Sequence, residues 1–284
     1  MFWLYLCNSS NIYIINMKSA KIFSVAILLS FTFLAGCNKG EGLNIFSIED
    51  DKTLGLQVRD EIASKPDEYP ILNKTSYADA YSYLERMKTT ILNSGQVTHK
   101  DDFAWELYII HDDNTQNAFC TPGGYIYIYT GLIKYLDNAS ALAGVMGHEM
   151  GHADKRHSTE AMTQQYGIST LAQVALGKNQ GMLSDIALSM VNLQFSRTNE
   201  KEADKYSVVY LCPTVYKANG ASAFFKKIID SGAAQPPAFL STHPNPENRV
   251  ENIDNQALSS SCAGGTISAA QDTTAYNAFK AMLP

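Results

Sequence analysis

The pentapeptide His-Glu-Met-Gly-His at positions 148–152 constrains this chain more than any other stretch. On an α-helix, residues four apart share a face, so the imidazoles of His148 and His152 can converge on one point. Two neutral imidazoles supply half of a tetrahedral Zn²⁺ site. Glu149 is the next residue around the helix, where its carboxylate can take a proton from a water molecule. The pentapeptide therefore predicts a zinc-dependent hydrolytic site on a helix.

The residues before the pentapeptide favour the helix that this site requires. Asn138 or Ser140 can cap a helix that continues through the apolar residues after them. Gly144, Gly147 and Gly151 fall on one stripe of that helix, and each costs roughly 1 kcal/mol relative to alanine. Such a stripe predicts that another backbone packs closely against the helix.

The zinc site needs a third protein ligand. His157 is the nearest histidine, but on a continued helix its side chain points away from His152, so we expect it at the surface. A metzincin pattern is excluded because Lys155 and Ser158 stand where that pattern needs glycine and histidine. The remaining candidates are the carboxylates of Glu160, Glu200, Glu202 and Glu247.

The segment Asn-Glu-Lys-Glu-Ala-Asp at 199–204 singles out Glu200. Glu200 and Asp204 share a helical face, whereas Glu202 is turned roughly 200° from Glu200. Glu200 can then bind the metal while Asp204 accepts the N–H of a ligating histidine. The alternative is a solvent-facing acidic stretch, but the presence of the pentapeptide in the same chain favours Glu200 as a metal ligand.

The N-terminal segment predicts export and a lipid anchor. A basic region begins at Met17, an apolar run covers 22–33, and Leu-Ala-Gly-Cys ends at Cys37. This order is typical of a signal peptide cut before a cysteine that then carries acyl chains. The alternative is an uncleaved signal anchor. The expected division is an upstream extension at 1–16, a signal peptide at 17–36, a lipidated tether at 37–46 and a single domain at 47–284.

Secondary structure follows the spacing of apolar residues. Helices are predicted over 47–64, 76–93, 158–176, 182–195, 200–211, 221–229, 247–255 and 269–283. Strands are predicted over 103–110 and 125–129. In the second, tyrosines alternate with isoleucines, which predicts a half-buried strand; if it lies at an edge, it can bind an extended peptide by strand addition. The residues assigned to this substrate strand are Asn117, Gly123, Gly124 and Tyr125.

Three cysteines lie beyond the leader. Cys212 ends a helical segment, and Cys262 lies in the Ser/Gly-rich stretch 259–265. In an exported protein, a disulfide between them would attach the C-terminal segment to the body. Cys120 has apolar neighbours, which predicts a buried thiol.

The pentapeptide and the segment 196–204 together resemble the zinc metallopeptidase family of the CAAX prenyl protease and HtpX. The soluble envelope branch typified by BepA and LoiP is closer still, and 117–124 and 241–249 also match that family. The resemblance covers about 47–255 and includes no C-terminal helical-repeat domain. It implies an α+β, mostly helical zincin-like domain with a small β-sheet over the helix of the pentapeptide.

The resemblance also implies a zinc-dependent endopeptidase of the cell envelope that acts on misfolded or unassembled proteins. We expect an anchor at Cys37 that faces the periplasm from the outer membrane. A net charge of −6 without a basic block argues against a nucleic-acid partner, and the oligomeric state stays open. The implied roles are zinc ligands for His148, His152 and Glu200, general base for Glu149, ligand support for Asp204, and substrate or transition-state contacts for His243 and Arg249.

Two alternatives come from other classes of protein. One is a zinc-bearing chaperone or assembly factor with little proteolysis, in which His243 fills the fourth zinc position. The other is a structural lipoprotein whose zinc only stabilises the fold. An intact Glu149 argues against the second, because a purely structural site needs no base.

Overall fold

The computed structural model describes residue 44 and residues 46–178, 180–190, 192–231, 237–244, 248–262 and 265–284. The predicted leader and the lipidation site Cys37 lie outside the described residues. The stretch Gly42–Pro284 clusters as one compact unit. Among the described residues, no helix combines the length and the apolar character needed to cross a membrane.

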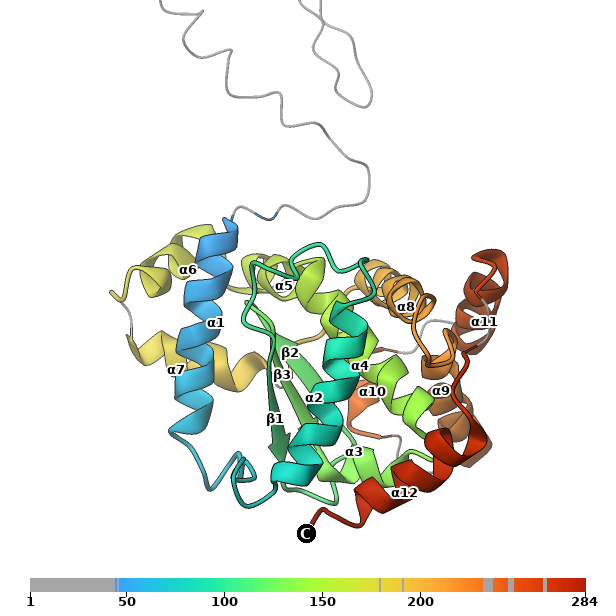
Figure 1. Cartoon of the computed structure of the whole chain (residues 1–284). Helices are drawn as coiled ribbons and strands as arrows, with labels where there is room; N and C mark the ends of the chain where they lie inside the picture. Colours follow the sequence, from blue (N-terminus) through green and yellow to red (C-terminus); the bar gives the residue numbers. More distant parts are fainter. Residues whose placement is uncertain are drawn as a thin grey trace, which may run out of the picture. The chain divides into compact units, whose positions relative to one another are not determined.

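The unit is mostly helical and contains one small sheet (Figure 1), which confirms the predicted α+β class. The strands are β1 (Glu106–Ile110), β2 (Ala118–Thr121) and β3 (Tyr125–Tyr129). The first six helices are α1 (Ile48–Ala63), α2 (Ala78–Leu92), α3 (Thr130–Tyr135), α4 (Ala139–Asp154), α5 (His157–Tyr166) and α6 (Ile168–Ala175). They are followed by α7 (Gln180–Met190), α8 (Arg197–Leu211), α9 (Gly220–Ser231), α10 (Phe239–Thr242), α11 (Arg249–Ser259), the π-helix η1 (Ala270–Thr274) and α12 (Ala275–Lys280).

The sheet has the order β1-β3-β2, with β3 parallel to β1 and antiparallel to β2. The predicted alternation in β3 is confirmed, because its isoleucines pack with α2 and α4 and its tyrosines pack with α1, α6 and α7. Figure 1 shows these two groups of helices on opposite sides of the sheet. The prediction of a half-buried strand is wrong, since helices cover both faces and every residue of β3 is buried.

The central position of β3 also corrects the predicted substrate strand. Tyr125 pairs with Glu106 on one side and Thr121 on the other, so a peptide cannot pair with it. Gly123 and Gly124 form the turn between β2 and β3, and both have positive φ. In the described part of the chain, the edge strand next to α4 is therefore β2, which Asn117 precedes.

Short irregularities account for the other differences from the expected elements. The predicted helix at 158–176 is two helices, because Gly167 between them has a φ of +76°. The first strand starts only at Glu106, after Trp105 with a φ of +47°. The elements β2, α3 and α10 have four to six residues each, which is too short for a periodic signal.

The helix of the pentapeptide is α4, and every one of its residues is buried. The Asn138 side chain caps it by accepting from the Ala141 N–H at 2.9 Å. A Cβ at Gly144 would lie 2.0 Å from the backbone nitrogen of Ala221 in α9. Gly147 and Gly151 face α8 instead. The predicted close approach is confirmed, and it places α4 between α8, α9 and the sheet.

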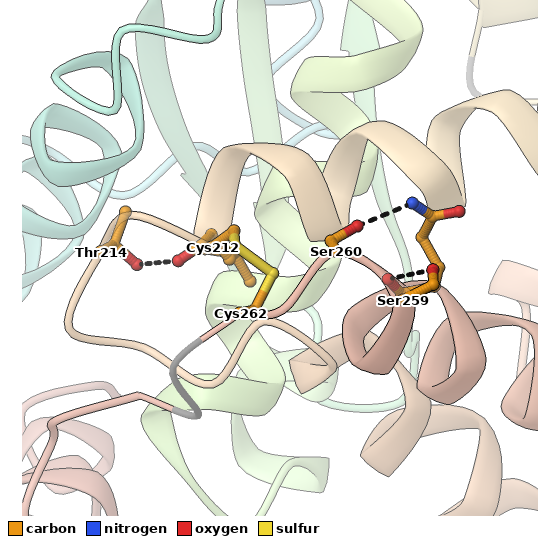
Figure 2. Close-up of a disulfide and its surroundings, with 7 residues drawn as sticks. Cys212, Thr214, Ser259, Ser260 and Cys262 are labelled. Carbon is orange, nitrogen blue, oxygen red and sulfur yellow. Dashed lines mark hydrogen bonds between the residues drawn. A yellow bond between two sulfur atoms is a disulfide. The ribbon is translucent and has the colours of Figure 1, made fainter.

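The predicted cysteine pair forms a disulfide in the structure. Figure 2 shows Cys212, at the end of α8, bonded to Cys262, and their Cα atoms are 5.0 Å apart. The bond joins the segment after α11 to α8, the helix that carries Glu200. Cys120 is buried as predicted, and burial raises the pKa of its thiol, so we expect it to be unreactive.

Candidate metal centre

Helices α4 and α8 bring together the three predicted ligands. The Nε2 atoms of His148 and His152 are 3.0 Å apart. Glu200 Oε2 lies 3.5 Å from His148 Nε2, and Glu200 Oε1 lies 3.3 Å from His152 Nε2. Ligand atoms on a tetrahedron with zinc bonds of about 2.0–2.1 Å lie about 3.3 Å apart. The three spacings are close to this value, although the two histidines are approached by different oxygens of Glu200.

His243 joins these residues from the end of α10. Its Nδ1 is 2.9 Å from Glu200 Oε1 and 3.3 Å from His148 Nε2. One ligand atom from each of these four side chains lies within 4.8 Å of all the others. The segment that carries His243 is held in place, because the Phe239 N–H donates to the Gln116 carbonyl and the Phe239 ring stacks on His243 at 4.1 Å. The fold thus brings His243 to the position where a fourth ligand would stand.

The donor set fits a metal cation. Three imidazoles and a carboxylate face a common point, and at most 1% of each of these residues is exposed. Glu149 Oε1 is also buried and makes no hydrogen bond within the described part of the chain. Its nearest basic group is His243 Nε2 at 3.4 Å. Burial of a carboxylate is costly, and a cation close by would reduce that cost. Nitrogen and carboxylate oxygen are the ligands that Zn²⁺ takes in catalytic sites.

Asp204 and Arg249 support the ligands from the side. His148 Nδ1 lies 2.9 Å from Asp204 Oδ1, and a hydrogen donated there would leave Nε2 to bind a metal. Arg249 donates to both Asp204 oxygens at 2.7 and 2.8 Å, and its Nη2 is 2.9 Å from Glu200 Oε2. The guanidinium also lies over the Phe225 ring at 3.9 Å. Only 2% of Arg249 is exposed, which favours positioning of the carboxylates over substrate contact.

Burial and neighbouring charges set the proton affinities in the site. Burial raises the pKa of Glu149, and nearby His243 and His148 only partly oppose it. Burial acts in the same direction on Glu200, but His243, His148 and His152 hold its pKa well below the usual value. Burial lowers the pKa of His152, which favours the neutral form that binds a metal. The lowered pKa of Glu200 suits a metal ligand, which must be ionised. The raised pKa of Glu149 suits a general base.

The expectation that His157 lies at the surface is wrong. Helix α4 ends at Asp154, Arg156 has a φ of +63°, and α5 begins at His157, so the chain turns where a continued helix was assumed. Only 2% of His157 is exposed, and its Nδ1 lies 3.0 Å from His152 Nδ1. A left-handed arginine gives no signal in the sequence, since this conformation is typical of glycine and asparagine.

The sequence pattern of Peptidase family M48 matches this chain over residues 79–257, the stretch that holds every residue of the site. The chain belongs to peptidase family M48. The family predicted from the pentapeptide and the segment 196–204 is thereby confirmed at the level of a metallopeptidase.

Three relatives illustrate the proteins to which this chain is similar. The chain is 28% identical over 216 residues to the mitochondrial metalloendopeptidase OMA1 of Schizosaccharomyces pombe, which covers 74% of this chain and 62% of that protein. It is 29% identical over 210 residues to the putative beta-barrel assembly-enhancing protease of Vibrio cholerae, which covers 64% of this chain and 43% of that protein. It is 26% identical over 254 residues to the metalloprotease LoiP of Escherichia coli K12, which covers 82% of this chain and 96% of LoiP. The chain thus spans less than two thirds of the length of the first two relatives.

Proposed function

We propose that this chain is a zinc-dependent endopeptidase of the cell envelope. The observation that carries the proposal is the convergence of His148, His152 and Glu200, whose ligand atoms lie 3.0–3.5 Å apart, with Glu149 next to His148 on α4. The names of the relatives, a metalloendopeptidase and two proteases, support it. When bound, zinc supplies a Lewis acid that makes water a usable nucleophile near neutral pH.

The remaining chemistry is assigned to residues of the chain itself. Glu149 accepts the proton of the attacking water and returns it to the leaving amine, and its raised pKa suits both transfers. Asp204 and Arg249 keep His148 and Glu200 in the orientation that binds the metal. Because these groups are buried, proton transfer takes place away from bulk water, where electrostatic effects are stronger.

We propose that the substrate is an extended segment of an unfolded or unassembled envelope protein. β2 is an edge strand of the sheet and packs against α4, so strand addition by a substrate would take place at β2. This would require the substrate to displace the Asn117 and Ser158 side chains from the Ala118 N–H and the Cys120 carbonyl. Asn117 lies at the start of this strand and is buried beside it. The similarity to proteins named β-barrel assembly-enhancing proteases supports a role in envelope protein quality control.

The metal assignment is tested by zinc content and by chelation. We expect His148→Ala, His152→Ala and Glu200→Ala each to lower zinc per chain from one to well below one, because a catalytic site needs three protein ligands. Glu160→Ala serves as the control. Glu160 lies on α5, accepts a hydrogen bond from Asn199, and is not one of the four residues that offer a ligand atom. Chelation should stop cleavage of an unfolded outer-membrane protein, and added Zn²⁺ should restore it. Full zinc in Glu200→Ala would mean that another carboxylate is the ligand.

The position of His243 predicts a restrained enzyme. Its Nδ1 stands at ligand distance from Glu200 and His148, whereas a catalytic zinc keeps its fourth position open. We expect His243→Ala to retain zinc and to raise basal cleavage about tenfold, the equivalent of losing a contact of about 1.4 kcal/mol. Steady-state cleavage with parallel zinc analysis measures both quantities.

Other results for His243→Ala would assign the residue differently. A loss of about a hundredfold or more with zinc retained would make the imidazole an oxyanion donor. Unchanged cleavage and zinc would make it a loop residue without a role. A wild-type chain that binds zinc and unfolded protein but hardly cleaves would favour the chaperone alternative, which the placement of His243 over the site supports.

The lipid anchor is proposed from the sequence of the leader. We expect a labelled fatty acid to be incorporated into the wild-type chain and not into Cys37→Ser, because acylation needs the thiol. Cys120→Ser is the control that keeps the leader intact. Equal labelling of the wild type and Cys37→Ser would remove the anchor and leave the protease assignment untouched.

A further inference from the structure

The second ring nitrogen of His152 faces another histidine. His152 Nε2 points to the ligand group, and His152 Nδ1 lies 3.0 Å from Nδ1 of His157. The other nitrogen of His157, Nε2, lies 3.3 Å from Glu202 Oε2. The two imidazole rings meet edge to face, at 76° and 5.0 Å between centroids. A chain of polar groups therefore leads from the metal centre to Glu202, whose side chain is 38% exposed.

When both imidazoles are neutral, only one placement of hydrogens gives every contact between His152, His157 and Glu202 one donor and one acceptor. A carboxylate can only accept, so His157 Nε2 carries a hydrogen and donates it to Glu202. His157 Nδ1 then has a free lone pair and accepts the hydrogen on His152 Nδ1. His152 Nε2 is left without a hydrogen, which is the form that binds a metal. The opposite tautomer of His152 would place a hydrogen at the ligand position.

We propose that His157 and Glu202 hold His152 in its metal-binding tautomer. Both are positioning residues, because His157 contacts the outer nitrogen of His152 and Glu202 contacts His157, and neither is one of the four residues that offer a ligand atom. The proposal rests on the zinc site proposed above and extends it. His148 receives its support directly from Asp204, whereas His152 receives it from a carboxylate through an intervening imidazole. The two histidines of the pentapeptide are thus oriented by different kinds of contact.

The fold maintains the turn that makes this contact. Arg156, in the left-handed region, forms an ion pair with buried Asp51 of α1 and donates to the carbonyls of Phe46 and Ser47. A residue other than glycine keeps such a conformation only where its surroundings enforce it. The Phe195 ring stacks on His152 at 3.8 Å and restricts rotation of that imidazole. These contacts hold His157 against His152 rather than in solvent.

The first test is zinc affinity, measured by competition with a chelator in the full chain. We expect His157→Ala to weaken zinc binding about 10- to 100-fold, the usual effect of removing an outer partner of a ligand. His157→Asn retains an amide oxygen that can accept from His152, so it should recover most of that loss. Glu202→Ala should weaken binding less, and it should add nothing in the His157→Ala background. Lys201→Ala, exposed on the same helix as Glu202, is the control and should bind zinc as the wild type does.

The second test does not depend on the metal. Nitrogen-15 spectra of the imidazoles in metal-free protein should show His152 with its hydrogen on Nδ1, and His157→Ala should abolish that preference. Equal zinc affinity in the wild type and His157→Ala, or an Asn variant no better than Ala, overturns the relay. A hydrogen on His152 Nε2 overturns it as well. If the zinc affinities and the His152 tautomer are as expected but the protein cleaves no substrate, the proposed function is wrong and the positioning role of His157 and Glu202 stands.

Discussion

Glu149→Gln is expected to lower the rate of peptide cleavage by at least about a hundredfold while one zinc stays bound. A positioned general base contributes about 10²–10⁴ in rate, and an amide cannot accept the proton of the attacking water. The side chain keeps its size and lies beside the ligands without being one of them. The measurement is kcat on an unfolded protein substrate, with zinc content determined on the same preparation.

The free energy of unfolding of Glu149→Gln shows whether any loss of activity comes from a loss of fold. Burial raises the pKa of Glu149, so the folded chain disfavours the ionised form. A neutral amide at this position should therefore leave the free energy of unfolding unchanged or slightly higher. Glu251→Gln, at an exposed position on α11, is the matched control and should retain full activity. Cleavage at the wild-type rate by folded, zinc-loaded Glu149→Gln would falsify the assigned mechanism.

Gly144→Ala is expected to lower the free energy of unfolding by about 3 kcal/mol. Helix propensity alone predicts the opposite sign, because alanine is favoured over glycine by about 1 kcal/mol inside a helix. The new Cβ would meet the nitrogen of Ala221 at 2.0 Å and the carbonyl carbon of Gly220 at 2.5 Å. Both are backbone atoms, so α4 and α9 must separate, and overpacking of this kind typically costs 1–3 kcal/mol or more.

Gly181→Ala is the matched control for this substitution. Gly181 also lies in a helix, but within the described part of the chain no atom of a neighbouring element lies within 4 Å of the place that a Cβ would take. We expect this variant to be as stable as the wild type or about 1 kcal/mol more stable. Urea unfolding of both variants measures the difference. Stabilisation by Gly144→Ala would show that the two helices are not packed as closely as the structure has them.

The sequence by itself determined the features that depend on local helical geometry. The spacing of His148 and His152, and that of Glu200 and Asp204, places each pair on one face whatever surrounds the helix. The stripe of glycines on α4 predicted a close backbone contact for the same reason. The alternation in β3 likewise assigned its tyrosines and isoleucines to opposite faces. These patterns repeat over several residues, so neighbouring positions reinforce one another.

Tertiary structure alone decided which of these surfaces are covered and which distant groups meet. β3 is central because β1 and β2 both pair with it, and strand order cannot be read from one strand's own pattern. His157 reaches His152 only because Arg156 leaves the helical conformation, held there by contacts with α1. His243 lies 95 residues from His148 in sequence and meets it through the docking of α10. Such contacts depend on packing between elements far apart in the chain, and no local spacing carries that information.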